Sequence, residues 1–139
     1  MENAFREAFE RGARAAVLAG TDVPDLEPDR VLEAERALQD HDAVLGPAED
    51  GGYHLIGLTR RGFSSDLFRD APWSTPQVLP RTLARLTARG MAVHQLPTCA
   101  DVDELADLRA LARRLDPRGP HAQLARLVAE TLESAGEQP

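Results

Sequence analysis

The chain has 139 residues, of which 42% are hydrophobic, and its net charge at pH 7 is −7. This length suits one domain with a hydrophobic core, and no apolar run approaches the roughly 20 residues that span a bilayer. All 16 basic residues are arginines without clustering, which argues against a nucleic-acid-binding surface and excludes a lysine nucleophile. The first residues do not resemble a signal peptide, and the lone Cys99 has no disulfide partner within the chain. We therefore expect a cytoplasmic protein.

Helical and strand patterns alternate along the chain. The pattern predicts a first helix over 3–11 that ends at Gly12, and a strand over 15–19 of the kind buried on both faces of a parallel sheet. Further strands are predicted at 43–46, 53–58 and 92–96, and further helices at 28–40, from Ser74 or Thr75 to 89, from Asp103 to about 115, and at 121–134. This alternation indicates an α/β layer fold, in which ligands bind beyond the carboxyl ends of strands.

The first polar cluster covers residues 20–26, directly after the strand at 15–19. Asp22 in this loop could hold Mg²⁺ or Mn²⁺ against a diphosphate, because such metals bind through one or two carboxylates and the substrate phosphates. The alternative is a loop in which Asp22 and Asp25 bond backbone amides. Spacing alone favours that alternative.

The second cluster covers residues 46–53 and contains Asp50 followed by two glycines. The glycines would let the backbone approach a ligand, and Asp50 could bond a sugar hydroxyl or act as a general base. The same Asp-Gly-Gly sequence is also a good signal for a hairpin between two strands. The sequence gives the two interpretations equal weight.

Two further clusters carry candidate site residues. Asp101 and Asp103 would bring a second carboxylate to Asp22, although Asp103 is favoured as the N-cap of the next helix. Trp73, the only tryptophan, precedes a predicted helix N-terminus and could stack on a sugar or a base, although a buried core position is favoured. The four histidines have no metal-ligand spacing, so we do not expect a zinc site.

Taken in order, these clusters resemble the DUF2064 family of bacterial glycosyltransferase-A-like proteins, which includes glycosyltransferases associated with arsenosugar biosynthesis. The segments that carry the resemblance are 17–26, 44–58, Pro72-Trp73-Ser74-Thr75-Pro76 and Asp101-Val102-Asp103. The match extends over roughly residues 3–112. More distantly, the chain looks like the molybdenum-cofactor and phospholactate guanylyltransferases.

The resemblance implies a three-layer, Rossmann-like nucleotide-diphospho-sugar transferase fold with Mg²⁺ or Mn²⁺ as its cofactor. By position, Asp22 and Asp103 match the metal-binding aspartates, and Asp50 matches a catalytic position. The residues expected to contact substrates are Thr21, Gly51, Gly52, Tyr53, Trp73, Ser74 and Thr75. We expect a partial domain over 1–116, with a C-terminal helix and tail over 117–139 packed on it.

The sequence departs from the family pattern in two places. The family begins with a strand and a phosphate-binding loop rich in Pro, Gly, Lys and Arg, and this chain starts after them. The expected fold therefore lacks its first strand, and a second copy or a partner chain would complete the sheet. In addition, Glu104 and Leu105 follow Asp103, where the family often has Thr-Pro, so the turn there is expected to differ.

Three functions follow from this resemblance. The first is a metal-dependent transferase that moves a glycosyl group from a nucleotide sugar to a small-molecule acceptor. The second keeps the fold but joins a nucleoside triphosphate to a phosphorylated acceptor, so that pyrophosphate leaves. The third is a non-catalytic, dimerising domain, since an open sheet edge favours pairing with another chain.

Overall fold

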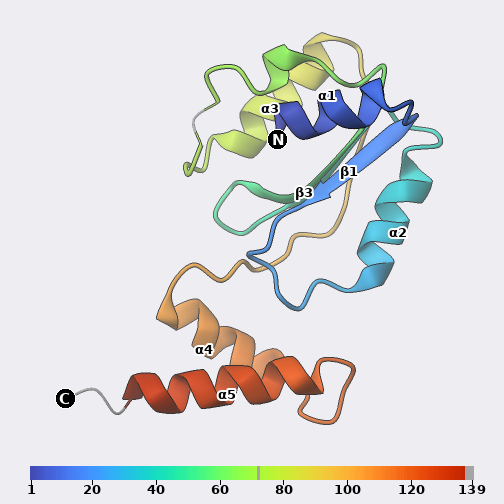
Figure 1. The fold of residues 1–139 in the computed structure, drawn as a ribbon. Helices are drawn as coiled ribbons and strands as arrows, with labels where there is room; N and C mark the ends of the chain where they lie inside the picture. Colours follow the sequence, from blue (N-terminus) through green and yellow to red (C-terminus); the bar gives the residue numbers. More distant parts are fainter. Residues whose placement is uncertain (72, 137–139) are drawn as a thin grey trace.

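The computed structural model describes residues 1–71 and 73–136, so Pro72 of the tryptophan cluster and residues 137–139 of the predicted tail lie outside it. Figure 1 shows a small sheet with helices on both sides and a pair of helices beyond one of its ends. In chain order the elements are α1 (Glu2–Glu10), β1 (Ala15–Ala19), α2 (Pro28–Ala37), β2 (Ala43–Pro47), β3 (Tyr53–Thr59), the 3₁₀ helix η1 (Ser65–Leu67), α3 (Val78–Ala88), β4 (Val93–Gln95), α4 (Leu105–Arg114) and α5 (Ala122–Gly136).

The sheet has four strands in the order β1-β3-β2-β4. Strands β2 and β4 are parallel, whereas β3 runs antiparallel to both β1 and β2. The prediction that the strand at 15–19 belongs to a parallel sheet is therefore wrong, because β1 pairs with the antiparallel strand β3. Strand β3 runs antiparallel to β2 because only five residues connect them, whereas parallel neighbours need a crossover of a dozen or more residues. Strands β1, β2 and β4 still run in one direction, so their carboxyl ends lie at the same end of the sheet.

Helices cover both faces of the sheet, which gives the three layers that were expected. On one face, Phe5 and Phe9 of α1 and Leu86 of α3 pack against alternate residues of β2 and β3. On the other face, Ala34 of α2 and its C-cap residue Leu38 pack against Val44, Leu55 and Leu96. This alternation follows from the two-residue period of strands, which directs successive side chains to opposite faces. The apolar runs of β2 and β3 are therefore buried on both sides.

Strand β1 is an edge strand. Among the described residues it pairs with β3 only, and four of its five residues are partly buried while Ala19 is exposed. The prediction of a strand buried on both faces is therefore wrong for β1 as it stands. A second copy or a partner strand at its outer edge stays a prediction.

Helices α4 and α5 pack on each other around a separate apolar core that contains Leu111, Leu115 and Val128. Figure 1 shows this helical hairpin, defined as residues 105–136, beyond one end of the sheet. It is tied to the loop after β1 by an ion pair from Arg114 to Asp25 and by a hydrogen bond between His121 and Glu27. The predicted division of the chain at residue 116 falls between the two helices and stays a prediction.

No helix within the described part of the chain combines the length and the apolar character needed to cross a membrane. The cytoplasmic location stays a prediction.

Candidate functional site

A cleft of about 540 Å³ lies at the end of the sheet where β1, β2 and β4 finish. Polar side chains reach it from three loops, as expected for a ligand site in an α/β sheet. The residues that line it come from the loops after these strands, from the start of β3, from the start of α3 and the segment before it, and from the first residue of the chain: Met1, Asp22, Ala48, Asp50, Gly52, Tyr53, His54, Trp73, Ser74, Thr75, Pro76, Val78, Asp101 and Asp103.

Three carboxylates form the tightest group in this cleft. One oxygen from each of Asp50, Asp101 and Asp103 lies within 4.8 Å of the others. Burial raises the pKa of Asp101, and the negative charges of Asp50 and Asp103 raise it further. The sequence placed Asp101 and Asp103 in one candidate cluster and gave the metal-ligand role to Asp103. It could not show that Asp50 lies beside them, because the proximity of these loops depends on the tertiary fold.

The favoured prediction that Asp103 caps helix α4 is wrong. The N-cap is Glu104, and Asp107 accepts hydrogen bonds from the backbone N–H groups of Glu104 (2.9 Å) and Asp103 (3.2 Å). Either Asp103 or Glu104 could serve as the N-cap. Glu104 does so because Asp107, three residues later, completes a capping box with it. The carboxylate of Asp103 therefore faces the cleft.

Asp22 enters the same cleft from the loop after β1. Its Oδ1 accepts a hydrogen bond from the hydroxyl of Thr21 at 3.2 Å, and its carbonyl oxygen accepts one from the N–H of Val102 at 2.8 Å. The second bond places the Asp22 loop beside the segment that carries Asp101 and Asp103. Asp22 is not part of the three-carboxylate group, and Thr21 contacts Asp22 without lining the cleft.

The Asp-Gly-Gly segment forms the connection between β2 and β3, so the hairpin interpretation is right for the backbone. The side chain of Asp50 nevertheless lines the cleft. Asp50 Oδ1 accepts a hydrogen bond from the N–H of Gly52 at 2.7 Å, which fixes the carboxylate at the cleft. Gly51 has φ +87° and a Cβ there would lie 2.6 Å from Cα of Pro76. Gly51 therefore serves close packing of the loop against the segment before α3, and it does not line the cleft.

The segment before α3 forms one wall of the cleft. Trp73 is 44% exposed, so the favoured prediction of a core position for it is wrong. Helix α3 begins at Val78 with Gln77 as its N-cap, and the predicted caps at Ser74 and Thr75 are also wrong. Ser74 has φ +59°, and Thr75 precedes a proline, which disfavours helical backbone. These residues are thus left to line the cleft.

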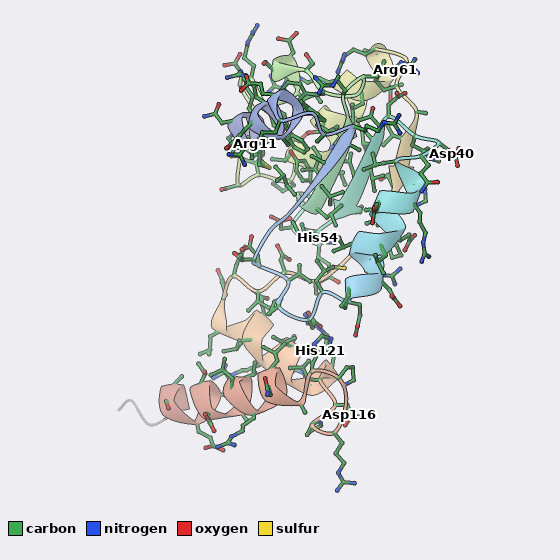
Figure 2. The ribbon with its side chains drawn as sticks, turned by 45° about the vertical axis from the view of Figure 1, so that its right-hand side comes forward. Arg11, Asp40, His54, Arg61, Asp116 and His121 are labelled. Atoms are coloured by element: carbon green, nitrogen blue, oxygen red, sulfur yellow. The ribbon has the colours of Figure 1, made fainter. Side chains whose placement is uncertain are left out.

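His54 is the cleft residue that sequence reasoning missed. It lies near the start of β3, at the end of the sheet that faces the helical hairpin (Figure 2). The side chain is 6% exposed, and its Nδ1 lies 3.1 Å from the carbonyl oxygen of Pro47. A carbonyl only accepts, so Nδ1 carries the proton. The buried Nε2 has no hydrogen-bond partner among the residues that the structure describes, and it presents a lone pair. Burial lowers the pKa of His54.

The packing of the His54 ring explains why β2 has a glycine at position 46. A Cβ on Gly46 would lie 2.7 Å from Cε1 and 2.8 Å from Nε2 of His54. The neighbouring Tyr53 is partly buried, and burial raises the pKa of its hydroxyl. The position of His54 two residues after the Asp-Gly-Gly segment was the signal in the sequence that could have indicated its place at the cleft.

Comparison with known proteins agrees with this architecture. The model of a family described as uncharacterized proteins conserved in bacteria (DUF2064) matches residues 1–75, just over half of the chain. The chain belongs to this family. The match includes Asp22, Asp50 and Trp73, whereas Asp101 and Asp103 lie beyond it.

A solved structure extends the comparison to almost the whole chain. It is the crystal structure of a "putative nucleotide-diphospho-sugar transferase" from Desulfovibrio desulfuricans G20, with 34% sequence identity and a TM-score of 0.84. The similarity covers 96% of this chain but 60% of that protein, so the chain spans less than two thirds of its neighbour. No curated protein matches the chain significantly. The expected family and the nucleotide-diphospho-sugar transferase fold are confirmed.

Proposed function

We propose that the cleft binds a nucleotide sugar together with Mg²⁺ or Mn²⁺ and supports transfer of the glycosyl group to a small-molecule acceptor. One observation carries this proposal. Asp22, Asp50, Asp101 and Asp103 come from three loops and line one cleft, which an exposed tryptophan also lines. Like charges gathered in this way repel one another unless a cation is bound. The acidic wall suits a metal, and the exposed indole suits a sugar or a base.

The donor atoms fit a hard divalent cation. Carboxylate oxygens are the ligands that Mg²⁺ and Mn²⁺ prefer, and the lone pair on His54 Nε2 adds an unsatisfied acceptor at the same cleft. We propose Asp22 and Asp103 as ligands, as the family pattern implies, and add Asp101 because it lies next to Asp103. When bound, the cation would neutralise negative charge on the departing diphosphate.

The remaining side chains would hold the acceptor and accept its proton. In the transfer, the bond between the sugar carbon and the diphosphate oxygen breaks, and a bond from that carbon to an acceptor hydroxyl oxygen forms. The hydroxyl proton needs a base, for which Asp50 is the candidate because its carboxylate is fixed by Gly52 at the cleft. Trp73 and Tyr53 would provide the apolar wall for the sugar or the acceptor.

Product analysis tests the proposed reaction. The chain is incubated with Mn²⁺, UDP- or GDP-sugars and a panel of small alcohols, and nucleoside diphosphate is measured by chromatography. Release that depends on the acceptor, and that is lost in Asp103→Ala, is the expected result. If a nucleoside triphosphate instead gives pyrophosphate, the reaction is nucleotidyl transfer. Absence of turnover with every donor contradicts catalysis by this chain on its own.

Asp50 has two candidate roles, because it is also part of the three-carboxylate group. An Asp50→Asn variant separates them. If Asp50 is the base, Mn²⁺ affinity changes little while turnover falls at least about a hundredfold. If Asp50 is a metal ligand, Mn²⁺ affinity falls together with turnover.

A further inference from the structure

Arg114, the last residue of α4, contacts both the loop that carries Asp22 and the segment that carries Asp101 and Asp103. Its Nε and Nη2 donate hydrogen bonds to Oδ2 (2.7 Å) and Oδ1 (3.1 Å) of Asp25, in the loop that carries Asp22. Nη2 also lies 3.3 Å from the carbonyl oxygen of Ala100, in the segment that carries Asp101 and Asp103. One guanidinium therefore bridges both segments.

The Asp22 loop is attached to α4 and its preceding segment at two points. At one point the N–H of Val102, three residues before the helix, donates to the carbonyl oxygen of Asp22. At the other point the Arg114 side chain holds the carboxylate of Asp25, three residues further along the loop. Two attachments fix both the position and the direction of a short loop, whereas one attachment would leave it free to rotate.

The pair has the properties of a fixed contact. The Asp25 side chain is 18% exposed and that of Arg114 is 33% exposed. The hydrogen bonds from Arg114 lower the pKa of Asp25, so the carboxylate stays charged at neutral pH. The two hydrogen bonds form a bidentate (two-pronged) contact, which a guanidinium makes with a carboxylate and an ammonium group cannot reproduce. A hydrogen bond between His121 Nε2 and Glu27 Oε1, 2.9 Å apart, holds the far end of the same loop.

We propose that Arg114 is a positioning residue for the cation site, acting through Asp25 and Ala100 to hold Asp22 at a fixed separation from Asp101 and Asp103. This inference rests on the proposed function, because it assumes that these carboxylates bind a cation. Arg114 does not touch the cation. Its side chain sets the geometry of residues that do.

The sign of the effect distinguishes positioning from simple electrostatics. A positive charge near an acidic site weakens cation binding, so loss of the Arg114 charge alone would strengthen it. Loss of the positioning contact has the opposite effect, because misplaced ligands bind a metal less tightly. Removal of residues that orient metal ligands typically weakens binding by roughly 10- to 100-fold.

The test is calorimetric titration of Mn²⁺ into the wild type and three variants at pH 7.5 and fixed ionic strength. Arg114→Lys keeps the charge and removes the two-pronged geometry, and Arg114→Gln removes both. Arg113→Gln, at the exposed neighbouring residue, is the matched control for loss of charge. Circular dichroism at the titration temperature establishes that each variant is folded.

We expect Arg114→Lys and Arg114→Gln to bind Mn²⁺ about tenfold more weakly, and Arg113→Gln to bind it as tightly as the wild type or slightly more tightly. The proposal is overturned if Arg114→Lys binds like the wild type or if Arg114→Gln binds more tightly. Should Arg114→Gln fail to fold, Arg114→Lys decides the question alone.

A second readout keeps this inference separate from the proposed function. If the wild type binds no Mn²⁺, the metal-dependent function fails, and hydrogen exchange at the Val102 amide still tests the positioning role. That amide bonds the Asp22 carbonyl, so we expect it to exchange several-fold faster in Arg114→Lys than in the wild type. Equal exchange rates would show that Arg114 does not hold the loop.

Discussion

Replacement of Asp101 by Asn should make the metal-free protein more stable and the metal-loaded protein less stable than the wild type. Asp101 has two carboxylate neighbours, Asp50 and Asp103, within 4.8 Å. At that separation each pair of unit charges repels by about 1 kcal/mol in water-like surroundings. Loss of one charge therefore relieves about 1–2 kcal/mol at low ionic strength.

The direction of the pKa shift of Asp101 also predicts that loss of its charge stabilises the metal-free protein. Burial and the neighbouring carboxylates raise it, so the stability that the protonated group contributes at low pH is lost as the pH rises through the folded-state pKa. At pH 7 the charged group is a net cost in the absence of metal. For a domain of this size, a gain of 1–2 kcal/mol raises Tm by about 3–6 °C.

The assay is thermal unfolding of wild type and Asp101→Asn at pH 7, with and without Mn²⁺, in 20 mM and in 500 mM NaCl. Mn²⁺ at a hundred times its Kd would stabilise the wild type by about 2.7 kcal/mol, whereas the variant should gain much less. High salt should reduce the metal-free difference, because it screens the repulsion. A variant that is less stable without metal, or that keeps the full Mn²⁺ shift, refutes this reasoning.

Three further predictions follow from single contacts. In urea titrations, Gly51→Ala should lower the free energy of unfolding by about 1–3 kcal/mol more than Gly12→Ala does. Both glycines have positive φ, but only at Gly51 would the added Cβ lie within 3 Å of a neighbour, Pro76. Equal losses in the two variants would contradict the close packing. Burial lowers the folded-state pKa of His54, so the stability from its neutral form is complete above the unfolded pKa of about 6.5 and is lost as pH falls below it. The wild type should therefore lose more stability than His54→Gln between pH 7.5 and 5.5, by up to about 1.4 kcal/mol per pH unit, and parallel pH profiles would argue against this. Trp73 is the only tryptophan and is 44% exposed, so acrylamide quenching of its fluorescence should fall when Mn²⁺ and a nucleotide sugar bind, and unchanged quenching alongside calorimetric binding would place the ligand elsewhere.

Most of the architecture could be predicted from hydrophobic patterns, because strands such as β2 and helices such as α5 have strong periodicity. The parallel-sheet prediction for β1 was wrong, since an apolar run looks the same in parallel and antiparallel sheets. The connection of only five residues between β2 and β3 was the feature that indicated an antiparallel pair. The edge position of β1 could not be seen locally, because exposure depends on which strands pair with it.

The candidate site was predicted in part. Aspartates serve equally as helix caps and as metal ligands, so the sequence could not separate these roles at Asp103, and the structure gives the capping role to Glu104 and Asp107. Trp73 was misjudged for a similar reason, since an indole fits both a core and a ligand-binding wall. His54 became a candidate only when tertiary packing placed it in the cleft, and the same packing brought Asp101 next to Asp50 and Asp103.

The central claim is that this cleft binds a divalent cation together with a nucleotide. The most direct measurement is calorimetric titration of Mn²⁺, with and without UDP or GDP, into the wild type and Asp22→Ala. The proposed function predicts Mn²⁺ binding that strengthens in the presence of the nucleotide and is lost or greatly weakened in the variant. Absence of Mn²⁺ and nucleotide binding by the wild type would contradict it.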